Sequence, residues 1–204
     1  MIGWAKRLRK ELQEVRQLSV EDEPDIFLRV HEDSLLEWRA WIRGPHDTPY
    51  ADGVFELEIK VTTEYPLSPP TVRFATPVFH PNVHGVTGEV CVDILKSEWT
   101  PAWTLLAACR AVRAVLEHPN ADSPLNCDAG NLIRRGALEE FEDLARTAVA
   151  EHALREIPSS GATPSPGSDK PRLRGKHQGS CFYWHYLLAL SPIFGVLIMQ
   201  AVSG

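Results

Sequence analysis

Four short runs of strand-forming residues follow one another early in this chain, and they constrain its fold more than any other feature. The runs cover residues 26–30, 36–43, 54–61 and 72–74. Turn pairs such as Gly44-Pro45 separate them. In the third run, Phe55, Leu57 and Ile59 alternate with charged side chains, which gives one apolar and one polar face. This succession predicts a four-stranded antiparallel meander with helices packed over its apolar face.

Helical periodicity flanks the strand runs, at residues 4–18, 105–116, 126–134 and 138–152. One apolar stripe of the second helix would pack on the sheet, and it consists of Leu105, Cys109, Val112 and Leu116. Cys109 is therefore interpreted as a core thiol. The sequence Asp122-Ser123-Pro124 predicts a helix start, because serine can cap a helix and proline is tolerated in its first turn. The fold class is α/β, in its α+β form.

Composition narrows the class of protein. The 204 residues are 44% hydrophobic, which allows one domain of roughly 150 residues and an appendage. The four cysteines lack paired spacing, which argues against a disulfide framework and fits a reducing compartment. We find no metal-ligand spacing and no glycine-rich phosphate loop, so we expect no metal and no cofactor. The net charge of −6 disfavours binding to nucleic acid.

The clearest chemistry lies at residues 80–95. Cys91 follows Asn82 by nine positions. A thiolate is a nucleophile and a thioester leaving group, and a side-chain amide can hydrogen-bond an oxyanion. His80 and Pro81 would order a turn that brings the two together, and Gly85 and Gly88 would allow the bend before the cysteine. Taken alone, a cysteine of this kind is more often a buried and inert thiol.

The surrounding segments resemble the landmarks of the ubiquitin-conjugating enzymes, in the order of that family. They are residues 38–45, 48–50, 53–55, 65–70, 99–104 and 122–126. The resemblance extends from about Lys6 to about His152. It implies the ubiquitin-conjugating fold, in which an N-terminal helix, a central helix and C-terminal helices surround the four-stranded meander. It also implies that Cys91 accepts ubiquitin as a thioester and transfers it.

The resemblance assigns roles around the cysteine. Asn82 would donate to the oxyanion or hold its loop, and both roles stay open. Many relatives carry an aspartate before the proline where this chain has Ser123, so Asp122, Ser123 or burial alone would activate the incoming lysine. Asp93 would polarise the approach to the site or cap a loop. Trp99 is interpreted as packing support beneath the site.

The resemblance also implies two docking surfaces. The first, for the ubiquitin-activating enzyme, holds the basic residues Lys6, Arg7, Arg9 and Lys10, which equally fit a solvated helix face. The second matches the positions that contact RING-type ubiquitin ligases, at Leu67, Pro101 and Ala102. Leu67 stands where many relatives have phenylalanine, which leaves the choice of ligase open.

One branch of the family is most similar. The extra residue between Asn82 and Cys91, together with residues 87–91, 101–104 and 122–128, resembles the peroxisomal (peroxin) conjugating enzymes. This implies transfer to peroxisomal import receptors at the cytosolic face of the peroxisome, aided by a membrane protein that recruits the enzyme. Two alternatives stay open, namely a quality-control enzyme of the cytosol or endoplasmic reticulum, and a non-catalytic adaptor of the same fold.

Beyond the catalytic domain, placed at residues 1–157, the composition changes. Residues 158–180 are rich in proline, serine and glycine, which predicts a flexible linker. Residues 181–204 carry no charge and just reach the length of a membrane span. Basic residues between 170 and 176 would stay on the cytosolic side. A tail anchor and a segment extraneous to the protein are both consistent with this pattern.

Overall fold

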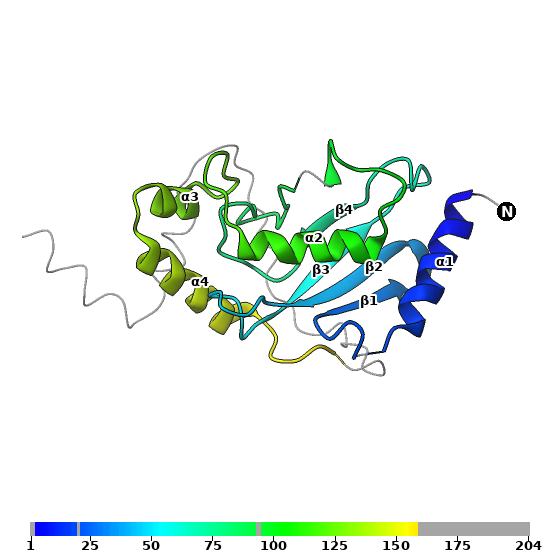
Figure 1. Cartoon of the computed structure of the whole chain (residues 1–204), viewed down its shortest axis with the longest axis horizontal. Coiled ribbons are helices and arrows are strands. Elements are labelled where there is room, and N and C mark those ends of the chain that lie inside the picture. The colour runs from blue at the N-terminus through cyan, green and yellow to red at the C-terminus, as the bar shows by residue number, and fades with distance from the viewer. Residues whose placement is uncertain (1–2, 20, 93–94, 159–204) are drawn as a thin grey trace, which may run out of the picture. The chain divides into compact units, whose positions relative to one another are not determined.

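One antiparallel sheet with four helices around it forms the described part of the chain, residues 3–19, 21–92 and 95–158 of a computed structural model (Figure 1). In chain order the elements are α1 (Gly3–Gln17), β1 (Ile26–His31), β2 (Ser34–Arg43), β3 (Val54–Lys60), β4 (Thr71–Phe74), α2 (Leu105–Glu117), α3 (Cys127–Arg134) and α4 (Leu138–His152). The predicted α+β architecture is confirmed, and each element lies within two residues of its predicted bounds.

The sheet is a simple meander in the order β1-β2-β3-β4. Each strand pairs with the next, so that Ala40 lies opposite Leu57 and Ile59 lies opposite Val72. The alternation predicted for β3 is present, because its apolar side chains are buried and its glutamates are partly exposed. Glu58 pairs with Arg73 on the neighbouring strand at 2.6 Å. Cross-strand ion pairs therefore line the polar face and apolar side chains fill the other.

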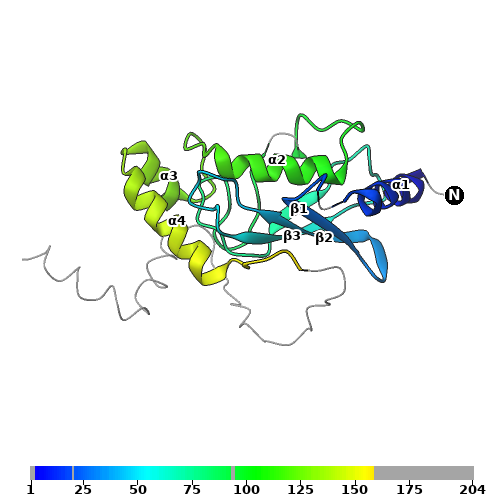
Figure 2. The ribbon, with the colours of Figure 1, turned by 60° about the horizontal axis from the view of Figure 1, so that its bottom comes forward.

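Helix α2 packs against β1 and β2, as Figure 1 shows. Its predicted stripe is buried, because Leu105, Cys109, Val112 and Leu116 are all at most 1% exposed. Burial raises the pKa of the Cys109 thiol to about 12, so this thiol stays protonated at neutral pH. The prediction of a core thiol is confirmed. Helices α3 and α4 lie at the end of the sheet opposite α1 (Figure 2).

The predicted helix start at Asp122-Ser123-Pro124 is wrong. Helix α3 begins at Cys127, and Asn126 caps it by accepting from the backbone N–H groups of Asp128 (3.1 Å) and Ala129 (3.2 Å). The preceding residues stay outside the helix because their backbone is bonded elsewhere. The N–H groups of Leu125 and Asn126 both donate to the carbonyl oxygen of Pro81.

The predicted linker and apolar segment, residues 158–180 and 181–204, lie outside the described residues except for Pro158. In the part of the chain that the structure describes, no helix has the length and apolar character needed to cross a membrane.

Candidate active site

A short hairpin holds Cys91 beside Asn82. The N–H of Cys91 donates to the carbonyl oxygen of Asn82 at 2.9 Å. One step further into the hairpin, Val83 pairs with Val90 in an antiparallel bridge, and both valines are buried. Two residues nine positions apart are thus joined by a backbone hydrogen bond, and the hairpin stem is anchored in the core.

The hairpin can reverse because of Gly88. This residue has a φ of 73°, in the left-handed region that favours glycine, whereas Gly85 does not. A Cβ atom at Gly88 would lie 2.0 Å from the carbonyl oxygen of Phe74, at the end of β4. The same close approach lets the N–H of Phe74 donate to the carbonyl of Gly88 at 2.8 Å. The active-site hairpin is therefore fastened to the edge strand of the sheet.

His80 lies beneath this hairpin and is fully buried. Its Nδ1 atom accepts from the N–H of Asn82 at 3.0 Å. Burial lowers the pKa of His80 to about 3, and a backbone contact with Val115 offsets only part of that effect. The ring is therefore neutral at physiological pH, which leaves Nδ1 free to accept. His80 positions the backbone of Asn82.

The side chain of Asn82 is clamped to the loop between α2 and α3. Its Oδ1 atom accepts from the N–H of Asn120 at 2.8 Å, and its Nδ2 atom donates to the carbonyl of Asn120 at 2.9 Å. Nδ2 carries two hydrogens, and it donates one of them to Asn120. The geometry thus shows a loop-holding contact and leaves one N–H of Asn82 for another acceptor.

The cysteine itself is half-buried and free. The Nζ atom of Lys96 lies 3.4 Å from its Sγ atom. Asp122 and Ser123 are exposed on the loop that Asn82 clamps, and the N–H of Asp122 donates to Oδ1 of Asn120 at 2.8 Å. Asp93 lies outside the described residues.

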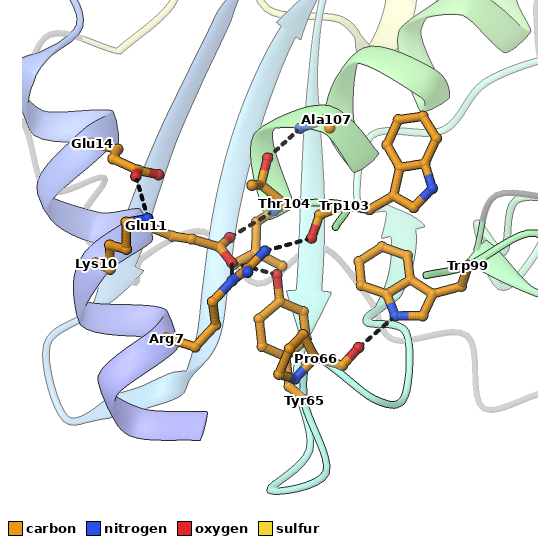
Figure 3. Close-up of polar contacts among 11 residues, drawn as sticks. Arg7, Lys10, Glu11, Glu14, Tyr65, Pro66, Trp99, Trp103, Thr104 and Ala107 are labelled. Atoms are coloured by element: carbon orange, nitrogen blue, oxygen red, sulfur yellow. Dashed lines mark hydrogen bonds and ion pairs between the residues drawn. The ribbon is translucent and has the colours of Figure 1, made fainter. Parts of the chain in front are cut away.

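The basic residues of α1 fall into two groups. Lys6, Arg9 and Lys10 are exposed. Arg7 is partly buried and donates to Oε1 of Glu11 at 2.5 Å and to the carbonyl of Trp103 at 2.8 Å (Figure 3). Three of the four predicted docking residues therefore point to solvent, whereas Arg7 is engaged in contacts within the domain.

Glu11 is a buried carboxylate whose importance the sequence analysis missed, with only 3% of its surface exposed. Besides Arg7, it accepts from the hydroxyl of Tyr65 at 2.7 Å (Figure 3). It also accepts from the N–H of Leu105 at 2.8 Å. It thus joins α1, the loop after β3 and the start of α2. The signal in the sequence is its position three residues after Leu8, on the apolar side of the predicted helix.

Two loops on the same side of the domain present the predicted ligase contacts. Leu67 is 79% exposed, and Pro101 and Ala102 are exposed as well. The loops are braced by Trp99, whose Nε1 donates to the carbonyl of Pro66 at 2.9 Å (Figure 3). The three positions predicted to contact a ligase are thus all open to solvent.

Within the described ranges, no group of three or more His, Cys, Asp or Glu side chains is arranged to hold a metal ion.

Comparisons with known proteins agree with this geometry. The sequence model of the family described as "Ubiquitin-conjugating enzyme" matches residues 7–149. The chain is 53% identical to Protein PEROXIN-4 of Arabidopsis thaliana over 140 residues, which are 69% of this chain and 88% of that protein. It is 52% identical to Ubiquitin-conjugating enzyme E2 pex4 of Dictyostelium discoideum over 136 residues, or 66% of this chain and 91% of the relative.

Among solved structures, the fold is similar to the H. polymorpha ubiquitin conjugating enzyme Pex4p, which was crystallised in complex with the soluble domain of Pex22p. The TM-score is 0.69 and the sequence identity is 34%. The match covers 74% of this chain and 98% of Pex4p in that structure.

Proposed function

This chain belongs to the ubiquitin-conjugating enzyme family, and we propose that it carries ubiquitin as a thioester on Cys91 and transfers it to peroxisomal import receptors. The observation that carries this proposal is the free, half-buried Cys91 held against Asn82 by the anchored hairpin. Similarity to PEROXIN-4 and to pex4 supports the peroxisomal receptors as the substrate class. A non-catalytic adaptor would have no need of this nucleophile.

The proposed reaction has two acyl transfers. The Cys91 thiolate attacks the ubiquitin carboxyl carbon, which the activating enzyme delivers as a thioester, a new C–S bond forms, and the thiolate of the activating enzyme leaves. A substrate amine then attacks the new thioester, and the tetrahedral oxyanion collapses with loss of the Cys91 thiolate. The N–H of Asn82 that Asn120 leaves unused is the proposed donor to this oxyanion.

Activation of the incoming amine is assigned to the loop that Asn82 clamps. Asp122 and Ser123 are both exposed there, beside the backbone that contacts Asn82. A carboxylate can take a proton at neutral pH and a serine hydroxyl is a poor base, so Asp122 is the proposed proton acceptor. Ser123 then contributes polarity and hydrogen bonding.

Partner proteins are proposed to dock at the end of the domain that holds α1 and the two loops braced by Trp99. The exposed Lys6, Arg9 and Lys10 would contact the ubiquitin-activating enzyme. Leu67, Pro101 and Ala102 would contact a RING-type ligase. Arg7 of α1 donates to the carbonyl of Trp103, which follows Ala102, so the two proposed surfaces adjoin each other. The activating enzyme and the ligase would then exclude one another, and charging would alternate with discharge.

Membrane recruitment is proposed to use a separate protein, because the similar Pex4p was solved with the soluble domain of Pex22p. The working location is the cytosolic face of the peroxisome. A catalytic domain within residues 1–157 fits the family match to residues 7–149. A linker at 158–180 and an anchor at 181–204 are the second proposed route to the membrane.

The substrate class is tested with full-length enzyme, activating enzyme, ATP and ubiquitin, together with the peroxisomal import receptor and RING ligase of the same organism. We expect ubiquitin on the receptor with the native enzyme and with Cys127→Ala, which removes another partly buried thiol. We expect none with Cys91→Ala. Efficient transfer to an endoplasmic-reticulum quality-control substrate, with the receptor left unmodified, would favour the alternative function.

A further inference from the structure

Two contacts anchor the loop between α2 and α3 on either side of Asp122, the proposed proton acceptor. On one side, Asn82 bonds both backbone groups of Asn120, at 2.8 and 2.9 Å. On the other side, the N–H of Leu125 donates to the carbonyl oxygen of Pro81 at 2.8 Å. Because Pro81 and Asn82 begin the active-site hairpin, both anchors tie the loop to that hairpin.

A third contact comes from α3, whose last residue is Arg134. The Nη1 atom of Arg134 donates to the carbonyl oxygen of Ala121 at 3.2 Å. Ala121 immediately precedes Asp122 in the chain, so the guanidinium reaches the loop within one residue of the proposed proton acceptor. Helix α3 therefore supports the same loop that the hairpin anchors.

Close packing between α3 and the loop puts the guanidinium within reach. A Cβ atom at Gly130 would lie 2.7 Å from the Cβ and Cγ atoms of Pro124 and 3.9 Å from Nη2 of Arg134. The glycine thus lets the helix approach the loop closely, and it stands about one helical turn before Arg134. Residues with this spacing share a helix face. The face of α3 that carries Arg134 is therefore the face packed against the loop.

The contact at Ala121 fixes one peptide unit. The carbonyl of Ala121 and the N–H of Asp122 belong to the same planar group. The N–H donates to Oδ1 of Asn120 at 2.8 Å, and the carbonyl accepts from Arg134. With both polar groups bonded, this unit cannot rotate without losing a hydrogen bond. Its plane sets where the Cα atom of Asp122 lies and restricts the directions that the carboxylate can take.

We propose that Arg134 is a positioning residue for ubiquitin transfer, which aims the Asp122 carboxylate at the amine that attacks the Cys91 thioester. The inference rests on the proposed roles of Cys91 and Asp122. Without the guanidinium, the peptide unit keeps its bond to Asn120 but can rotate about it, and the carboxylate spends less time within reach of the amine. Charging of Cys91 uses no substrate amine and does not need this contact.

The test compares charging with discharge in the full chain. The enzyme is charged with activating enzyme, ATP and ubiquitin, ATP is removed, and free lysine is added for a single turnover. We expect Arg134→Ala to charge at the native rate and to discharge about 10-fold more slowly, because small misplacements of a reacting group have large effects on rate. Arg134→Lys keeps a cationic donor for the carbonyl and should recover most of the native rate.

The matched control is Arg135→Ala, which removes the neighbouring cation. The guanidinium of Arg135 pairs with Glu140 on α4 at 2.6 Å, and this variant should charge and discharge like the native chain. Discharge at the native rate by Arg134→Ala, or equal slowing in Arg135→Ala, would overturn the proposal. The urea unfolding midpoints of the two alanine variants should agree. A lower midpoint in Arg134→Ala alone, together with slow discharge by Arg134→Lys, would indicate a general loosening and would overturn it as well.

A double variant shows whether Arg134 acts through Asp122. Asp122→Asn should slow discharge by itself, and adding Arg134→Ala should slow it no further, because the side chain being positioned no longer accepts a proton. A full second loss in the double variant, or a native rate in Asp122→Asn, would overturn the proposal while leaving the Cys91 thioester intact. A native chain that forms no thioester would contradict the proposed function itself.

Discussion

At the scale of single residues, the active site depends on side chains that form hydrogen bonds to the backbone of neighbouring segments. Asn82 has both polar atoms on Asn120, and His80 receives the N–H of Asn82. Each contact fixes a segment that would otherwise be free to move beside Cys91. Net contributions of about 0.5–1.5 kcal/mol for each such hydrogen bond are enough to hold a loop of this length.

Replacing Asn82 should separate charging from transfer. We expect Asn82→Ala to form the thioester and to lose about 10²-fold in the rate of transfer to lysine, because an oxyanion donor and the clamp on Asn120 disappear together. Single-turnover discharge after charging measures this rate. Asn131→Ala, which changes an exposed asparagine on α3, is the control. Transfer at the native rate by Asn82→Ala would contradict the assigned role.

His80 should make the fold sensitive to acid. Its pKa is about 3 in the folded state and about 6.5 in the unfolded state. Below pH 6.5 the unfolded state therefore binds a proton that the folded state does not bind. The free energy of unfolding should therefore fall between pH 6.5 and pH 5, with this residue contributing up to about 1.4 kcal/mol per pH unit. Urea unfolding of His80→Asn should lack that component, and His46→Asn, at an exposed site, should retain it. Equal slopes in native and His80→Asn protein would contradict the account.

The resemblance to the ubiquitin-conjugating enzymes predicted Asn82 and Cys91 as the reactive pair, because residue types and spacing alone are more typical of an inert thiol. The partner of Asn82 could not be predicted. Asn120 contributes backbone atoms, which leave no trace in residue identity, and it lies 38 positions away. Arg7 was grouped with its basic neighbours because its contacts with Glu11 and Trp103 depend on tertiary packing.

At the scale of elements, α1 is joined to the rest of the domain through one buried carboxylate. Glu11 connects α1 to Tyr65 in the loop after β3 and to the N–H of Leu105 at the start of α2. Arg7 balances its charge and reaches Trp103. The loops that carry the proposed ligase contacts thus share their support with the helix proposed to bind the activating enzyme.

Removing the charge of Glu11 should destabilise this end of the domain. We expect Glu11→Gln to lower the free energy of unfolding by about 3 kcal/mol, because a buried ion pair is broken and Arg7 loses its partner. Glu14→Gln, which removes an exposed pair with Lys10 on the same helix, should change it by less than about 1 kcal/mol. Urea unfolding measures both. Similar small losses of unfolding free energy in the two variants would show that Glu11 does not join α1 to the rest of the domain.

The elements themselves were largely predictable, since alternation and helical stripes report directly on buried faces. The range predicted for α3, residues 126–134, is close to the observed one. The separate helix start predicted at residues 122–124 was wrong, because Ser123 and Asn126 are both good caps and only the bonds to Pro81 decide between them. The burial of Glu11 was equally hidden, because its partners Tyr65 and Leu105 lie 54 and 94 positions away.

At the scale of the whole molecule, one sheet with four helices supports the hairpin that holds Cys91, which is fastened to β4, and the loops beside α1 that are proposed to bind partners. Sequential strands pair in chain order, so the meander followed from the sequence without any long crossover. The family match over residues 7–149 fits a single catalytic domain. The linker and the apolar segment predicted for residues 158–204 lie outside the described residues except for Pro158, and they stay a prediction.

The central claim is that Cys91 carries ubiquitin, and intact-mass measurement of the charged enzyme tests it most directly. After incubation with activating enzyme, ATP and ubiquitin, the full chain and residues 1–157 should each gain the mass of one ubiquitin and lose it on brief reduction. Cys91→Ser should give a reductant-resistant ester or no adduct, and Cys127→Ser should behave like the native protein. A reductant-sensitive adduct of normal yield on Cys91→Ala, or its location at Cys109 or Cys127, would contradict the account.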